Sequence, residues 1–345
     1  MLKYLFRYTL LPCAAALLAV GCNDEVFVDA FLPESPEIVV ERSGEASTLR
    51  FKASNWDVLS VMGPMSPLYG DIYDASGRLV ARGQSLCGEG LLTMVYDDGL
   101  LDFRIERSDY RELSVVLGEN LRERPYVVHI AVGNEYETGS VTATLAPSGK
   151  YRVDSVAYDW NAFFFTDNTA RTKEAFTIDN TESDQPVTMY VSPYRNEYRT
   201  VRFWPESYGD HREEILGLPL PEVRIPDTEE GRPVFGDASA RFVENEQRMP
   251  LSFSDEEQAA VTVPAGQRLR IEVLLVCEEF RVPYTLYVSH PVTGRRRTFT
   301  GTLFSSVPYH YYIFKTDPFV EPSASEPARI AETGDGRDQL NPDRS

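Results

Sequence analysis

The chain has 345 residues, of which 42% are hydrophobic, and this supplies enough apolar material for the cores of one or two domains. Its 53 acidic residues outnumber its 34 Lys and Arg residues, which gives a formal net charge of −19 at pH 7. Because nucleic-acid phosphates and anionic lipid headgroups are bound mainly by Lys and Arg, this charge argues against both as partners.

The first 21 residues have the pattern of an export signal. Lys3 and Arg7 precede a mostly apolar run, 8–20, which is much shorter than the roughly 20 residues of a membrane span. The run ends in Ala19-Val20-Gly21 and then Cys22, and small residues before a cysteine resemble the lipobox of bacterial lipoproteins. The resemblance implies cleavage after residue 21 and lipidation of Cys22, which would anchor the mature chain to a membrane. A plain secretory signal is the alternative interpretation.

The residues after the cysteine suggest where the anchor lies. Asn23-Asp24-Glu25 resembles the acidic export signal that sends lipoproteins of the Bacteroidota to the outer face of the outer membrane, although a solvated spacer is the alternative. We expect 22–36 to be a tether, because Pro33 and Pro36 interrupt regular structure. The predicted location is the outer membrane, lipid-anchored, with display at the cell surface.

The body of the chain is predicted to be all-β. In Thr48–Ala53 apolar and polar residues alternate with a period of two, which indicates a strand with one solvated face. Similar segments recur at short intervals between Gly, Pro, Asn and Asp, and helical periodicity is weak throughout. This pattern predicts two immunoglobulin-like antiparallel β-sandwich domains in tandem, at 37–147 and 148–317. We expect 318–345, which is rich in Pro, Ser and charge, to be a disordered tail.

Two long stretches interrupt the strands, and we expect both to be loops that could carry a binding surface. The first runs from Met62 to about Gly99 and is rich in Gly and Pro. The second runs from Pro205 to about Pro250 and is acidic and proline-rich. Beyond it, the pattern predicts separate short strands at 269–276, 284–289, 297–304 and 309–314.

The first predicted domain resembles a BACON module, an immunoglobulin-like sandwich common in surface proteins of the Bacteroidota. The resemblance rests on Ser54-Asn55-Trp56-Asp57-Val58 after the first hairpin, on Asn120 and Arg124 before the strand 126–132, and on Gly139 before the closing strand 141–145. It implies an association with carbohydrate-active enzymes and with glycan or mucin binding, or a role as a spacer. The second domain resembles no family.

The sequence shows no pattern that identifies a catalytic or metal site. None of the four histidines has a His or Cys partner at metal-ligand spacing. A glycosidase needs two carboxylates, but with 53 acidic residues any pair is expected by chance. We therefore predict a protein that is not an enzyme and uses no cofactor or metal, with a glycoside hydrolase-like enzyme as the third alternative. We expect Cys87 and Cys277 to be buried free thiols.

Aromatic residues are the one feature that favours a binding function. The chain has 19 Tyr, 18 Phe and 3 Trp, and flat rings of this kind stack on the C–H faces of sugars. Packing within the sandwich cores is the alternative explanation for each ring. The candidate ligand-binding residues are Tyr194, Tyr198, Trp204, Tyr208 and Tyr312.

These observations predict a surface lipoprotein that binds a glycan or a protein partner, with an accessory role in polysaccharide uptake as one form of that function. Its partners would be the membrane, through the lipid on Cys22, and a glycan or another envelope protein. The competing hypothesis is a structural or adhesive envelope protein, such as a fimbria-like subunit or a spacer built from the same sandwiches.

Overall fold

The structure is a computed structural model, which describes residues 31–317 and the strand 329–335. The predicted leader, Cys22 and most of the tether lie outside the described residues. Within the described part nearly every element is a β-strand, and the helical elements are η1 (Trp160–Ala162) and α2 (Arg212–Leu216). The predicted all-β class is confirmed. Neither helical element, in the part of the chain that is described, has the length or the apolar character needed to cross a membrane.

Contacts between residues divide the chain into two compact units. Of the described residues, unit 1 contains 31–151 together with the turn His290–Gly294, and unit 2 contains 152–289, 295–317 and 329–335. The sequence placed the division after Pro147 and assigned the turn to the second domain. The difference arises because the turn packs on unit 1, where Tyr151 contacts the ring of His290 edge-on.

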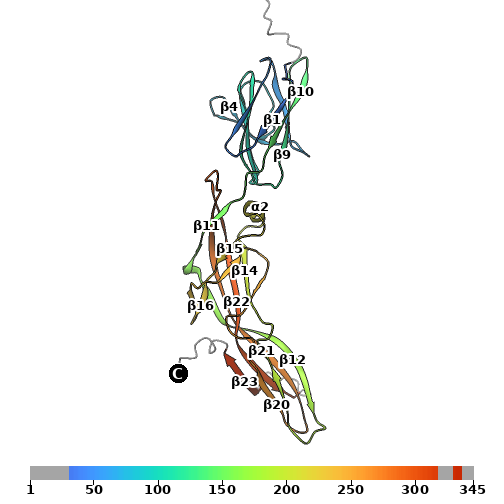
Figure 1. Cartoon of the computed structure of the whole chain (residues 1–345), viewed down its shortest axis with the longest axis vertical. Coiled ribbons are helices and arrows are strands. Elements are labelled where there is room, and N and C mark those ends of the chain that lie inside the picture. The colour runs from blue at the N-terminus through green and yellow to red at the C-terminus, as the bar shows by residue number, and fades with distance from the viewer. Residues whose placement is uncertain (1–30, 318–328, 336–345) are drawn as a thin grey trace, which may run out of the picture. The chain divides into compact units, whose positions relative to one another are not determined.

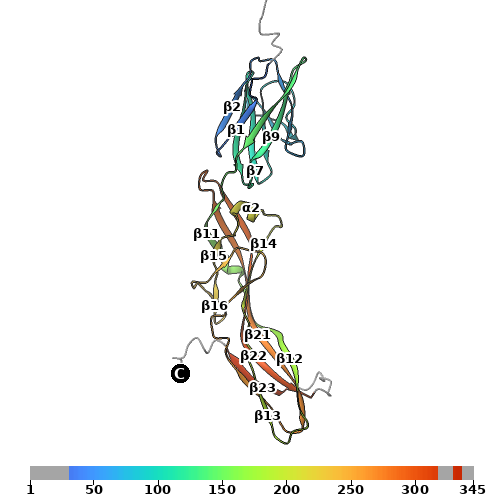
Figure 2. The same cartoon turned by 45° about the vertical axis from the view of Figure 1, so that its right-hand side comes forward.

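Unit 1 is built from two sheets, and some of their strands are labelled in Figures 1 and 2. The smaller sheet has the order β1 (Glu37–Val40), β10 (Thr138–Leu145), β9 (Tyr126–Gly133), β3 (Asp57–Met62). The larger sheet has the order β2 (Ala46–Arg50), β8 (Glu112–Asn120), β7 (Leu101–Asp109), β6 (Leu92–Asp97), β4 (Gly70–Asp74), β5 (Leu79–Gln84). β1 is parallel to β10, and the other pairs are antiparallel.

The core of unit 1 lies between these two sheets. Along β7 the side chains of Phe103 and Ile105 are fully buried while Arg104 between them is exposed, as the period of a strand requires. Trp56 is also buried, and its ring stacks on Phe51 at a centroid distance of 3.9 Å. The larger sheet and the smaller sheet therefore form a sandwich around one continuous apolar cluster.

The stretch from Met62 to Gly99, predicted as a loop, contains the three strands β4, β5 and β6. That prediction was wrong because the glycines mark tight turns between short strands. Gly77 and Gly99 have φ near +80°, and each lies in a connection that reverses the chain. Met94, on β6, is fully buried in the core, so this segment is an integral part of the sandwich.

Unit 2 is organised around two long antiparallel strands, β21 (Gln267–Ser289) and β22 (Arg296–Thr316), which run side by side in both cartoons. β11 (Arg152–Tyr158) and β12 (Phe164–Asn180) pair with the outer edge of β21. β14 (Arg199–Pro205) pairs with β22, and β19 (Gln247–Met249) pairs with β14. The sequence predicted each long strand as two shorter ones.

β21 continues without a break through Pro283, although a proline usually interrupts a strand. Proline has no N–H and is normally excluded from the middle of a sheet. Here β11 ends opposite Tyr284 and β12 begins opposite Arg281, so η1 leaves a gap beside Pro283. The carbonyl of Pro283 accepts a bond from the N–H of Asp159 in this gap.

Three two-stranded sheets complete unit 2. They are β13 (Val187–Val191) with β20 (Ala259–Val263), β15 (Glu222–Arg224) with β18 (Ser239–Arg241), and β16 (Asp227–Glu229) with β17 (Arg232–Val234). The first shares a buried cluster with the long sheet, which contains Val261 together with Ile271 and Ile313. The stretch from Pro205 to Pro250 is thus no single loop, since it contains α2 and strands β15 to β19.

The C-terminal strand β23 (Arg329–Asp335) pairs antiparallel with β22 between His310 and Lys315. The prediction of a disordered tail over 318–345 was wrong for this segment. β14 pairs with β22 only as far as Ser306, which leaves the backbone groups of the following residues for another strand. The other residues of the predicted tail lie outside the described part.

Candidate functional site

Tyr194, the first of the predicted ligand-binding residues, is part of the core. Its side chain is fully buried, its ring meets Phe253 and Tyr311 edge-on, and its hydroxyl donates to the carbonyl of Tyr309 at 2.9 Å. Because the hydroxyl has a backbone acceptor, the whole side chain can be buried at little cost. A ligand has no access to this ring, so its prediction as a binding residue was wrong.

The remaining four candidates do not form one site. Tyr208 is 91% exposed. Tyr198 lies under the guanidinium of Arg248, which is 4.3 Å from its ring centroid. Tyr312 is ten residues along β22 from Thr302, the cross-strand partner of Trp204, which corresponds to about 33 Å in a strand. The site is therefore built around Trp204 alone.

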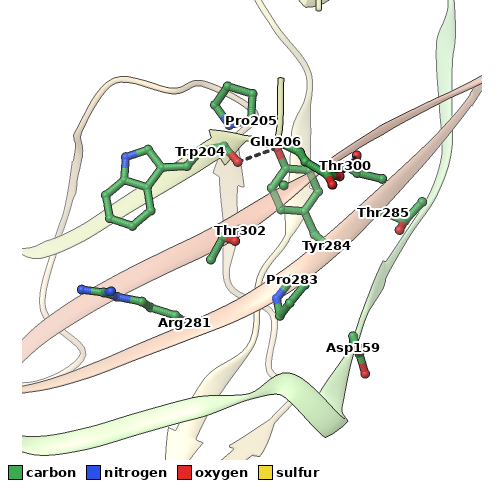
Figure 3. Close-up of a pocket in the computed structure, with 11 residues that line it drawn as sticks. Asp159, Trp204, Pro205, Glu206, Arg281, Pro283, Tyr284, Thr285, Thr300 and Thr302 are labelled. Atoms are coloured by element: carbon green, nitrogen blue, oxygen red, sulfur yellow. Dashed lines mark hydrogen bonds between the residues drawn. The ribbon is translucent and has the colours of Figure 1, made fainter. Parts of the chain in front are cut away.

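Trp204 lies at an open cavity of about 640 Å³ in unit 2, which we call the Trp204 cavity (Figure 3). Its lining comes from β14, β21 and β22 and from the residues that directly follow β11 and β14: Asp159, Trp204, Pro205, Glu206, Arg281, Pro283, Tyr284, Thr285, Thr300, Gly301 and Thr302. Apolar ring surface and hydroxyl groups therefore line the same hollow.

The cavity follows from strand alternation. Trp204 pairs with Thr302, and Thr302 pairs with Pro283, so these three residues lie in one row across the sheet. Their neighbours Phe203 and Leu303 point to the opposite face and are fully buried. Burial of Phe203 and Leu303 fixes the register of β14 and β22. In that register the row that contains Trp204 lies on the opposite face of the sheet, which is open to solvent.

The backbones of β14 and β22 lie unusually close together beside the cavity, at Trp204 and Gly301. A Cβ on Gly301 would lie 2.0 Å from the carbonyl oxygen of Trp204, so β14 can approach β22 this closely only because residue 301 is glycine. The hydroxyl of Tyr284 donates to the same carbonyl oxygen at 3.4 Å, drawn as a dashed line in Figure 3. Burial raises the pKa of Tyr284 to about 12, so the hydroxyl keeps its proton to a higher pH than an exposed tyrosine does.

The two carboxylates of the cavity are engaged with neighbouring groups. Glu206 accepts a hydrogen bond from the hydroxyl of Thr300 at 2.6 Å. Asp159 caps η1 by accepting a bond from the N–H of Asn161 at 3.1 Å. Each carboxylate has further lone pairs, which remain able to accept hydrogen bonds from the hydroxyls of a ligand.

The indole of Trp204 is supported from one side. It stacks on Phe304, with ring centroids 5.2 Å apart and an interplanar angle of 29°. The guanidinium carbon of Arg281 lies 5.8 Å from the Trp204 centroid and 5.7 Å from that of Phe304. The cavity thus combines an aromatic surface, a cation, hydroxyls and carboxylates. Among the described residues, no group of three or more His, Cys, Asp or Glu side chains is placed to hold a metal ion.

Sequence reasoning missed several residues of this region. Arg281, Thr300 and Thr302 become neighbours of Trp204 only through the register of long strands, and no local pattern marks them. Trp160 and Phe235 form a second exposed aromatic pair, with rings edge-to-face at 5.4 Å. Trp160 is exposed because it lies in the short helical turn η1, which Asp159 caps. The sequence Asp159-Trp160-Asn161, in which an aspartate precedes the turn, could have indicated this position.

The two free cysteines differ in their environments. Cys277 is buried, as predicted, and burial raises the pKa of its thiol. Cys87 is exposed, which corrects the prediction that both are buried. It follows Leu86, which is almost fully buried, so Leu86 supplies the core contact of this segment.

Comparisons with known proteins leave the family open. No protein-family model matches the sequence, and no curated protein matches it. Among solved structures, a lamprey immune protein is 12% identical, with 79% of this chain and 98% of that chain covered and a TM-score of 0.33. The β-pore-forming protein Mpp75Aa1.1 from Brevibacillus laterosporus is 12% identical, with coverage of 60% and 83% and a TM-score of 0.25.

The parasporin-2 toxin of Bacillus thuringiensis, described as recognising cancer cells, is 14% identical, with coverage of 54% and 75% and a TM-score of 0.22. Similarities at this level carry no argument about the function of this chain. The function is therefore argued from the Trp204 cavity itself.

Proposed function

We propose that the protein binds a carbohydrate in the Trp204 cavity and does not cleave it. The observation that carries this proposal is the half-exposed indole of Trp204 in a hollow that also contains the hydroxyls of Thr285, Thr300 and Thr302. A sugar ring presents apolar C–H faces and a rim of hydroxyls, which match an aromatic surface surrounded by hydrogen-bonding groups.

The proposal includes the cellular setting inferred from the sequence. The leader and Cys22 resemble those of a lipoprotein, and the first domain resembles BACON modules of cell-surface proteins. We therefore place the protein on the outer membrane, held by lipid and exposed at the surface, with a role in capturing polysaccharide for uptake. Metabolic labelling with a fatty acid, with and without a Cys22→Ala substitution, tests the anchor: loss of label in the variant is expected, and equal labelling would contradict it.

A glycan array followed by titration calorimetry tests the binding site. The mature protein is expected to bind at least one glycan class. Trp204→Ala is expected to weaken that binding at least tenfold through loss of the stacking surface, a cost of at least about 1.4 kcal/mol. Tyr208→Ala is the matched control, because it removes an exposed aromatic residue that does not line the cavity. Equal losses in both variants, or no binding by the wild type, would refute the proposal.

Incubation of the bound glycan with the protein separates binding from hydrolysis. We expect its mass spectrum to remain unchanged, because Asp159 caps η1 and Glu206 is bonded to Thr300. Appearance of shorter saccharides that depends on either carboxylate would instead support a glycoside hydrolase.

A second candidate function, as a structural or adhesive subunit, is favoured by strand β13. Within the described residues β13 pairs with β20 alone, and Val187, Met189 and Tyr190 on it are exposed. An apolar edge strand of this kind can pair with a strand of a second copy of the chain. Sedimentation velocity is expected to show concentration-dependent association that Met189→Lys abolishes; a monomer at all concentrations would rule this function out.

A further inference from the structure

We propose that the glycan bound in the Trp204 cavity is acidic, and that Arg281 binds its carboxylate or sulfate group. This inference rests on the proposed carbohydrate-binding function and specifies the class of ligand. The observation behind it is that the Arg281 guanidinium lines the cavity and has no carboxylate partner among the described residues.

Arg281 has no anionic partner among the described residues. Its side chain is exposed, and its guanidinium lies over the ring faces of Trp204 and Phe304. The positive charge of Arg281 therefore remains available to a ligand.

Neighbouring arginines of unit 2 are neutralised. Arg202, two residues before Trp204 on β14, donates to Glu246 at 2.8 Å. Arg212 donates to Asp210 at 2.7 Å, and Arg199 lies 3.5 Å from Asp227. Arg281 differs from these three in that it has no carboxylate partner in the described part of the chain, contacts the rings of Trp204 and Phe304, and lines the cavity.

The aromatic contacts orient the guanidinium without using its hydrogen-bond donors. A guanidinium that lies over ring faces keeps its N–H groups directed outward in its own plane, and two parallel N–H groups match the two oxygens of a carboxylate or sulfate. The position of Arg281 is fixed by its pairing with Phe304 across β21 and β22. The same pairing places it diagonally from Trp204, so that one sugar residue can contact both side chains.

The carboxylates of the cavity leave room for an anion. Figure 3 shows Arg281 on the same side of the cavity as the Trp204 ring, whereas Asp159 lies at the opposite side. Glu206 is bonded to Thr300, away from the guanidinium. An acidic sugar can therefore direct its anionic group to Arg281 and its hydroxyls toward the acceptors of Asp159 and Glu206.

Titration calorimetry with matched pairs of oligosaccharides tests the inference. Each pair consists of a uronic-acid oligosaccharide and its carboxyl-reduced form, or of a sulfated oligosaccharide and its desulfated form. We expect at least tenfold tighter binding of the acidic member in one series, and the series that shows it identifies the anion. Arg281→Gln should remove this preference while binding of the neutral member is retained, and Trp204→Ala should weaken binding of both members.

Arg202→Gln serves as the control, because it removes a nearby charge that Glu246 already neutralises. It should keep the preference for the acidic member. Circular dichroism of each variant checks that the fold is intact. Equal binding of acidic and neutral members by the wild type would overturn the inference and leave carbohydrate binding in place, whereas binding of neither member in any pair would remove both.

Discussion

Arg107 shows how unit 1 accommodates a buried cation. Its side chain is 3% exposed, is paired with Asp57, and lies with its guanidinium carbon 4.4 Å from the ring centroid of Trp56. A buried charge is tolerated when it is paired and hydrogen-bonded, and here the carbonyls of Gly90 and Ser54 also accept from it. Trp56 is therefore a core residue whose ring face also contacts the guanidinium of Arg107.

Truncation of Trp56 is expected to be strongly destabilising. Trp56→Ala removes the stacking contact with Phe51 and the surface beneath Arg107, and we expect it to lower the free energy of unfolding by about 3–5 kcal/mol. Chemical denaturation followed by circular dichroism measures this change. Tyr208→Ala, at a 91% exposed position, should change it by less than about 0.5 kcal/mol. A small effect at Trp56 would show that the core cluster is loosely packed.

His290 stabilises the turn between the two longest strands. Its side chain is buried, and its Nδ1 accepts bonds from the N–H groups of Val292 and Thr293 at 3.3 and 3.2 Å. This geometry places the imidazole proton on Nε2. His290→Ala leaves two turn donors without their acceptor and should cost about 1–3 kcal/mol.

His290→Asn is the informative comparison for this turn. An asparagine side-chain oxygen accepts from backbone N–H groups two and three residues further on, as Asn134 does in this chain. We expect it to recover part of the stability lost in His290→Ala, as measured by thermal denaturation. Equal losses in the two variants would show that ring packing against Tyr151, and not the acceptor, accounts for the contribution of His290.

At the level of elements, the pairing of β14 with β22 determines the shape of the Trp204 cavity. Gly301→Ala would place a methyl group 2.0 Å from the backbone oxygen of Trp204, and the strands must separate to admit it. We expect a loss of about 1–3 kcal/mol of stability together with at least tenfold weaker glycan binding. Denaturation and calorimetry on the same preparation measure both effects.

Gly236→Ala is the matched control for this substitution, because a Cβ there meets no atom within 4 Å and the backbone φ is not positive. It should leave stability and binding unchanged. Normal glycan binding by Gly301→Ala would show that the position of Trp204 does not depend on the close approach of the two strands.

Elements that depend on their own residues could be predicted from the sequence, whereas elements that depend on pairing with distant strands could not. Period-two alternation in segments such as 48–53 predicted the all-β class. A dense apolar run predicted the strand of residues 126–132, which is β9 with one added residue at its C-terminal end. The continuity of β21 through Pro283 could not be predicted, since it depends on the gap between β11 and β12. In the same way Trp204 was identified from composition, whereas Arg281 joins it through cross-strand register.

At the level of the whole molecule, a half-buried tyrosine in unit 1 and buried tyrosines in unit 2 make the stability of the fold decrease at alkaline pH. Burial raises the pKa of Tyr96 in unit 1 and of Tyr284 in unit 2 to about 12, and it raises that of Tyr158 further. An exposed tyrosine ionises near pH 10. The folded state therefore holds these protons more tightly than the unfolded state does, and the stability this provides is fully present below about pH 10.

We expect the free energy of unfolding to fall as the pH rises from about 10 to about 12, with Tyr284 alone contributing on the order of 3 kcal/mol. Urea denaturation at stepped pH values, with tyrosinate absorbance as a second signal, measures the slope. The growing negative charge of an already acidic chain adds a general repulsion, so the comparison with Tyr284→Phe isolates the specific effect. The variant should lose less stability than the wild type over this interval, and parallel curves for the two proteins would contradict the assignment to Tyr284.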